Sequence, residues 1–118
     1  MPFDHERLDV YLLALDFIVL AADVVPKLPR GRAHLVDQLN RASTSIVLNI
    51  AEGAGKYSSS DKRRYYLSAM GSASECAAML DVCRKLRRID DELQRRGKEM
   101  LDRIVAMLVR LAANLERR

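Results

Sequence analysis

Polar side chains interrupt the apolar stripe of one predicted helix and reappear in the helix that follows it. Arg41, Asn49 and Glu52 lie in the first of these helices, and Ser72 and Glu75 lie in the second. Residues three positions apart share a helix face, so Asn49 lies beside Glu52. Ser72 and Glu75 are related in the same way. The pattern favours a satisfied, buried polar network in which Arg41 pairs with a glutamate, and a ligand pocket is the alternative interpretation.

The groups that metal binding or catalysis would need are missing or wrongly spaced. A di-metal carboxylate bundle uses two Glu-x-x-His pairs, yet neither His5 nor His34 follows a glutamate by three positions. The stretch Gly53-Ala54-Gly55-Lys56 fails as a phosphate loop, because its first glycine is replaced by Ile50 and its lysine is followed by Tyr57. Its glycines fit a helix C-cap and a turn better. We therefore expect no enzyme, no metal and no cofactor.

Two cysteines fall on one predicted helix. Cys76 and Cys83 are seven residues apart, which is about 10 Å along a helix axis and too far for a disulfide. The spacing is also wrong for a zinc knuckle. Two buried thiols in a reducing compartment are the favoured interpretation, with a redox pair as the alternative.

The sequence carries no predicted export signal or membrane span. Residues 1–6 are polar and acidic, whereas a secretory leader begins with a basic segment. The most apolar stretch, residues 10–25, contains Asp16 and Asp23 and is too short to cross a bilayer. We expect a cytoplasmic protein with no membrane partner.

Positive charge is concentrated in the second half of the chain. The first 59 residues hold 6 Lys and Arg against 7 Asp and Glu, and the remaining 59 hold 14 against 9. Two clusters border one predicted antiparallel turn and so share an end of the fold: Arg84, Lys85, Arg87 and Arg88, then Arg95, Arg96 and Lys98. Such a patch predicts salt-dependent binding of nucleic-acid phosphates. The alternative is that these cations stabilise helix dipoles and keep the protein soluble.

Four segments with helical periodicity must position these groups. They cover about residues 7–25, 33–53, 60–87 and 91–116, separated by short breaks rich in Pro, Gly and Ser. Short connections join antiparallel neighbours, so we predict an all-α, up-down-up-down four-helix bundle forming one domain over residues 1–118. We expect Ser60 to cap the third helix and the fourth to begin or bend at Gly97.

The first predicted helix is too apolar for a solitary bundle. Asp9, Asp16 and Asp23 are the only charged residues between Leu8 and Val25, whereas a helix in a monomeric bundle needs about a third to a half of its surface apolar. The excess predicts an oligomer interface on the outward face. A fully enclosed helix is the alternative.

The run Arg41-Ala-Ser-Thr-Ser-Ile-Val-Leu-Asn-Ile-Ala-Glu-Gly53 resembles the hallmark of one family. That family consists of proteins encoded in 23S ribosomal RNA intervening sequences, and the Gly71-Ser72-x-x-Glu75 pattern also fits it. The resemblance implies an antiparallel four-helix bundle assembled into a ring, typically a pentamer. It also suggests kinship with the accessory protein of diversity-generating retroelements, a basic bundle that binds nucleic acid and a reverse transcriptase. Tyr11, where many members have tryptophan, and the basic Arg30-Gly31-Arg32 linker depart from the pattern.

Three functional hypotheses follow. The leading one is a non-enzymatic homo-oligomeric scaffold that binds RNA or DNA through its basic surface. The second is a protein-interaction adaptor, with a partner such as a reverse transcriptase and no nucleic-acid binding. The third is a small enzyme that uses Asn49, Glu52 and Glu75, which would need a cavity lined by those side chains.

Overall fold

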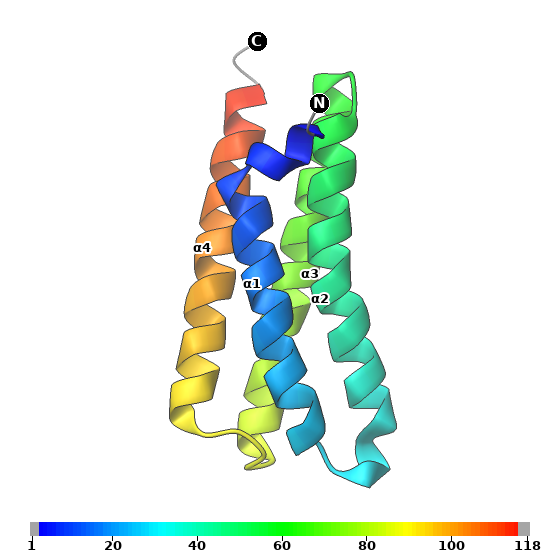
Figure 1. Ribbon diagram of the computed structural model, residues 1–118. Coiled ribbons are helices and arrows are strands. Elements are labelled where there is room, and N and C mark those ends of the chain that lie inside the picture. Colours follow the sequence, from blue (N-terminus) through cyan, green and yellow to red (C-terminus); the bar gives the residue numbers. More distant parts are fainter. Residues whose placement is uncertain (1–2, 116–118) are drawn as a thin grey trace.

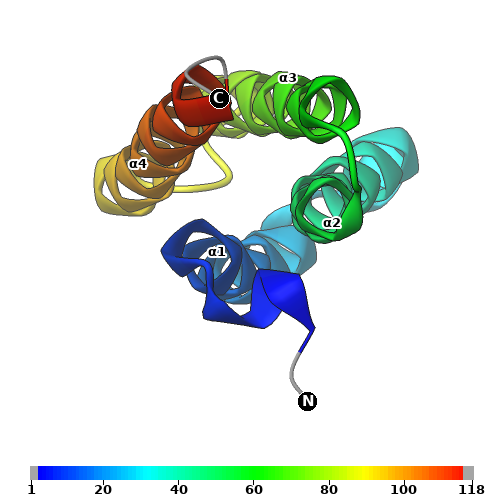
Figure 2. The same ribbon diagram turned by 90° about the horizontal axis from the view of Figure 1, so that it is seen from above.

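Four long α-helices account for most of residues 3–115, the part of the chain that this computed structural model describes. Their bounds are α1 Asp9–Val24, α2 Ala33–Gly55, α3 Ser59–Lys85 and α4 Asp91–Leu115. Each helix runs antiparallel to the next along the chain (Figure 1), and α4 returns beside α1 (Figure 2). The predicted four-helix bundle is confirmed. The predicted end of the fourth helix, residue 116, lies outside the described residues.

Short 3₁₀ helices form the entry to α1 and the connection to α2. The first, Asp4–Arg7, precedes Leu8, whose extended backbone (φ −81°, ψ 125°) interrupts the helix. For this reason α1 begins at Asp9 and not at residue 7. Two more 3₁₀ turns, Val25–Lys27 and Arg30–Arg32, span the connection from α1 to α2.

Gly53, near the end of α2, allows this helix to pack closely against α3 and does not act as a helix cap. No described glycine has a positive φ, so the expected glycine C-cap is wrong, and α2 continues to Gly55. Gly53 is buried, and a Cβ there would lie 2.8 Å from Cε1 of Tyr66 on α3. The cap of α3 is Ser58, whose hydroxyl accepts the Asp61 N–H at 3.1 Å, so Ser60 is not the cap.

Gly97 lies inside α4, which starts six residues earlier at Asp91. It is buried, and a Cβ on it would lie 2.5 Å from Cδ1 of Leu80 and 3.2 Å from Cδ2 of Leu20. The helix thus begins at the predicted residue 91, and the alternative start at Gly97 is wrong. The glycine lets α4 approach side chains of α3 and α1.

The core is aliphatic and contains both cysteines. Its largest fully buried side chains include Phe17, Ile46, Leu80 and Leu108. Cys76 and Cys83 are buried free thiols, as predicted. Burial, with the charge of Glu75 adding to it, raises the pKa of Cys76 to about 12. Within residues 3–115, no helix combines the length and apolarity that crossing a membrane requires.

Candidate nucleic-acid interface

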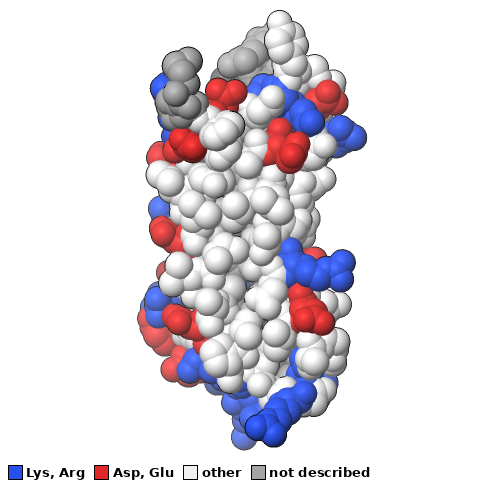
Figure 3. Space-filling view, turned by 45° about the vertical axis from the view of Figure 1, so that its right-hand side comes forward, with Lys and Arg blue, Asp and Glu red and all other residues white. Residues whose placement is uncertain are grey.

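The turn between α3 and α4 places the predicted basic residues at one end of the bundle. The connection from α1 to α2 reaches the same end (Figure 1), and Lys and Arg side chains gather there in the space-filling view (Figure 3). The turn is held by two backbone bonds, from Arg87 N–H to the Arg84 carbonyl and from Arg88 N–H to the Cys83 carbonyl. Arg87 adopts a left-handed conformation with φ 58°.

Three of the seven predicted cations are engaged in ion pairs. Nε of Arg84 lies 2.5 Å from Oδ1 of Asp91, and Nζ of Lys98 lies 2.8 Å from Oδ1 of Asp81. Hydrogen bonds from these cations lower the pKa of each carboxyl group. Arg95 binds two glutamates of its own helix, at 2.7 Å and 2.9 Å. These pairs are exposed and screened by water, so they add little to stability, but the charge of each cation is already balanced by its carboxylate partner.

The other four predicted cations have no side-chain partner within the described residues. Lys85, Arg87, Arg88 and Arg96 are all exposed. Three further exposed cations, which also have no partner among residues 3–115, come from the connection between α1 and α2, and sequence reasoning missed them as site residues. We call the combined set the basic end: Lys27, Arg30, Arg32, Lys85, Arg87, Arg88 and Arg96. These three residues could have been predicted from the antiparallel topology, because it brings the α1–α2 and α3–α4 connections to the same end of the bundle.

A cleft of about 470 Å³ separates the two connections at the basic end. Lys27, Arg88 and Arg96 border it, but so do the carboxylates Asp23 and Asp90. Carboxylates next to the cleft oppose an anion inside it.

The predicted polar network forms in part and lies nearer the surface than expected. The Ser45 and Ser72 hydroxyls are 2.9 Å apart, and the Asn49 amide donates to the Ser45 hydroxyl at 2.9 Å. These three side chains are half-buried, whereas Arg41, Glu52 and Glu75 are exposed. The three charged side chains are not buried, because they lie on the outer edges of α2 and α3. Glu52 lies 3.4 Å from Lys56, and in the described part of the chain Arg41 forms no ion pair with Glu52 or Glu75.

A pocket of about 310 Å³ lies over this network, between α2 and α3. Arg41 and Glu75 line it together with Gln38, Ser45 and Ser72. Both charged groups lack an ion pair within the described residues. Asn49 and Glu52 do not line it, so the three residues of the enzyme hypothesis do not share this cavity. Across residues 3–115, no three His, Cys, Asp or Glu side chains gather as a metal site.

The outward face of α1 is apolar and lies at the surface. Leu12, Leu15 and Val19 are 50%, 38% and 64% exposed. The interpretation of α1 as an enclosed helix is therefore wrong. Figure 3 shows a broad uncharged area in the middle of the face formed by α1 and α2.

Comparison with known proteins agrees with this architecture. No curated protein matches the sequence. The sequence model described as 23S rRNA-intervening sequence protein matches residues 6–110, nearly the whole chain. The chain therefore belongs to the family of 23S rRNA-intervening sequence proteins.

Proposed function

We propose that this protein is a non-enzymatic, homo-oligomeric scaffold that binds RNA or DNA through its basic end. The observation that carries the proposal is the gathering of seven exposed cations, none with an ion-pair partner in the described part of the chain, on two connections and the adjoining first turns of α4 at one end of the bundle. Cations already paired to carboxylates release little energy on meeting a phosphate. Unpaired cations can neutralise phosphates directly and release counterions.

Self-association is supported by α1. Exposed Leu12, Leu15 and Val19 form an apolar ridge of the kind that marks protein interfaces. Family resemblance implies a ring, with five copies as the expected number. A ring multiplies the basic end, and several weak phosphate sites on one assembly bind a long polymer more tightly than one site does. The two buried free thiols favour a reducing compartment such as the cytoplasm.

The second candidate function is a protein-interaction adaptor. The adaptor function is favoured by the pocket between α2 and α3, where Arg41 and Glu75 have no ion-pair partner among residues 3–115. A partner protein with one acidic and one basic side chain would satisfy both groups. A reverse transcriptase is the partner that the family resemblance suggests.

The nucleic-acid proposal is tested by two matched charge-removal variants. In one, Lys85, Arg87 and Arg88 become Gln; in the other, Arg84, Arg95 and Lys98 become Gln, so that each variant loses three positive charges. Binding of duplex RNA is measured by gel retardation across a salt series. We expect the first variant to lose roughly three units of the log–log salt slope, since each phosphate contact contributes about 0.9 for a duplex.

The second variant should bind nearly as the wild type, because its cations are already paired. An equal loss of RNA affinity in the two variants would show that RNA binding depends only on the net charge of the protein. Absence of RNA retardation by the wild-type protein at low salt would favour the adaptor function.

A further inference from the structure

The connection between α2 and α3, at the end of the bundle opposite the basic end, presents an aromatic ring to solvent (Figure 1). Tyr57 is 103% exposed, more than any other large hydrophobic side chain of residues 3–115. The other three tyrosines, Tyr11, Tyr65 and Tyr66, are half-buried or buried. Both faces of the Tyr57 ring therefore lie in water, and burial within the fold does not account for an aromatic residue at this position.

The residues around Tyr57 are strongly basic. Residues 56–65 hold four Lys and Arg against one Asp. Lys62 is used within the fold, since its Nζ donates to a backbone carbonyl at the end of α2, at 2.8 Å. Arg63 and Arg64 are exposed on the first turns of α3. The surface beside Tyr57 is therefore positive, and its charge is complementary to an anionic partner.

The guanidinium group of Arg64 is held in place but keeps donors for a further group. Lys56 and Arg64 lie over the ring of Tyr65, 5.2 Å and 5.1 Å from its centroid. Lys56 is also 3.4 Å from Glu52, and Arg64 is 3.6 Å from Asp61. A guanidinium group has five N–H donors, and the Asp61 contact is longer than the 2.7 Å and 2.9 Å pairs on α4. Arg64 can therefore donate to a phosphate without leaving its position over the ring.

A hollow of about 480 Å³ opens beside these arginines on the surface of α3. Its lining consists of Ser60, Arg63, Arg64, Leu67 and Ser68. Among the described residues, no carboxylate lines it. Two guanidinium groups and two hydroxyl groups around one hollow are donors of the kind that bind phosphate oxygens.

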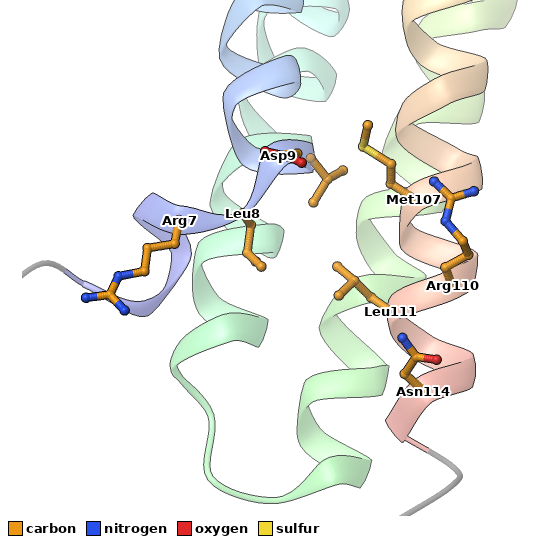
Figure 4. A pocket seen from close by; sticks show the side chains of 8 residues that line it. Arg7, Leu8, Asp9, Met107, Arg110, Leu111 and Asn114 are labelled. Atoms are coloured by element: carbon orange, nitrogen blue, oxygen red, sulfur yellow. The ribbon is translucent and has the colours of Figure 1, made fainter.

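Three other cavities of comparable size are lined in part by carboxylates. Figure 4 shows Asp9 and Arg110 on opposite sides of the cavity of about 360 Å³ between α1 and α4. Asp23 and Asp90 line the cleft at the basic end. Glu75 lines the pocket between α2 and α3. The hollow on α3 is therefore better suited to an anion than any of these three, because no negative group on its wall opposes one.

Tyr57 and the hollow are close enough to bind neighbouring parts of one nucleotide chain. The hydroxyl of Ser58, the residue after Tyr57, lies 3.3 Å from the hydroxyl of Ser60, which lines the hollow. Proteins bind single strands by stacking bases on aromatic rings while cations follow the phosphates. In a duplex the bases are already stacked on one another, so none of their faces is available to Tyr57. The arrangement therefore favours an unpaired strand.

We propose that the α2–α3 end binds single-stranded RNA or DNA, with one base stacked on Tyr57 and an adjacent phosphate bound by Arg63 and Arg64. This inference rests on the nucleic-acid binding in the proposed function and adds a second site with its own preference. Phosphate contacts at the basic end serve paired and unpaired strands alike, whereas stacking on Tyr57 requires an unpaired base. A protein partner fits less well, because a lone ring among cations is not the broad apolar patch that protein interfaces present.

The test compares Tyr57→Ala with Tyr57→Phe, which keeps an aromatic ring. The probes are a labelled oligouridine RNA and a labelled RNA duplex of equal length, and binding is measured by fluorescence anisotropy. We expect Tyr57→Ala to weaken oligouridine binding about tenfold, the loss of one stacked base, and to leave duplex binding unchanged. Tyr57→Phe should bind both probes as the wild type does. Circular dichroism should show that both variants fold, because the ring is fully exposed.

The phosphate contacts are tested by a variant with Arg63→Gln and Arg64→Gln. It should lower the log–log salt slope for oligouridine by roughly 1.4 units, since each phosphate contact contributes about 0.7 on a single strand. The matched control carries Arg95→Gln and Lys98→Gln, which remove the same charge from cations already paired on α4. This control should keep the wild-type slope, and an equal fall in both variants would overturn the assignment of the two arginines.

Three outcomes for Tyr57→Ala or the wild type overturn the proposal. They are an unchanged affinity of Tyr57→Ala for oligouridine, an equal loss on oligouridine and duplex, and absence of oligouridine binding by the wild type, which would favour a protein as the occupant. The basic end is assessed separately, by duplex binding of the variant in which Lys85, Arg87 and Arg88 become Gln. Unchanged duplex binding by that variant would contradict the proposed function of the basic end and leave the Tyr57 comparison valid.

Discussion

Arg87 holds a left-handed backbone conformation at the turn between α3 and α4, where helices most often place glycine. A side chain in this conformation costs about 1 kcal/mol relative to glycine. Among residues 3–115, no side chain pairs with its guanidinium group to offset that cost. The strain is consistent with a cation retained for contacts outside the molecule, as the proposed basic end requires.

Cys76 gives a pH-dependent prediction at the residue scale. Burial raises the pKa of its thiol to about 12 in the folded protein, while the thiol of the unfolded chain ionises near its ordinary pKa of 9.0. Between these values the unfolded state loses a proton that the folded state keeps, so stability falls as pH rises. We expect urea unfolding at pH 10 to show lower stability than at pH 7, and Cys76→Ala to reduce that difference.

The control is the pH 7 measurement on the same variant, which isolates the loss of packing from the loss of the thiol. Burial also raises the pKa of Tyr66 and Cys83, so part of the alkaline loss should remain in Cys76→Ala. A pH dependence identical to that of the wild type would contradict the assigned role of Cys76.

At the scale of helices, two glycines should respond oppositely to the same substitution. Gly53→Ala places a methyl group 2.8 Å from the buried Tyr66 ring, so we expect destabilisation of about 1–3 kcal/mol. Gly71→Ala meets nothing within 4 Å on the exposed face of α3 and should stabilise by about 0.5–1 kcal/mol. Thermal and urea unfolding of both variants measure the two signs, and a gain from Gly53→Ala would refute the packing argument.

The sequence predicts the helices better than their ends. Apolar periodicity located all four, because that pattern is a local property of each segment. The role of Gly53 was mistaken, since close approach of Tyr66 depends on how α2 packs against α3. The start of α4 was uncertain for the same reason, because contact of Gly97 with Leu80 is tertiary.

The position of the candidate site could be predicted from the sequence, but which of its cations are paired with carboxylates could not. Clustering and antiparallel topology placed Arg84, Arg88 and Lys98 near one end. Which cations remain unpaired depends on contacts across the turn, such as Lys98 with Asp81, seventeen residues away. Sequence spacing alone does not distinguish that pair from a free lysine.

For the whole molecule, the exposed ridge of α1 predicts stability that depends on protein concentration. A folded assembly is stabilised by mass action, so the melting temperature of the wild type should rise with concentration. Val19→Ser removes an apolar side chain from the ridge while keeping a similar helix propensity. We expect it to weaken association by about 1–2 kcal/mol per copy and to flatten the concentration dependence measured by differential scanning calorimetry.

Val109→Ser is the matched control. Val109 is also an exposed valine, but it lies on α4 and outside the apolar ridge of α1. It should retain the wild-type rise of melting temperature with concentration. If both substitutions flatten the dependence equally, the interface is not specific to α1. If the wild type shows no dependence up to high concentration while remaining monomeric, the apolar ridge has another partner.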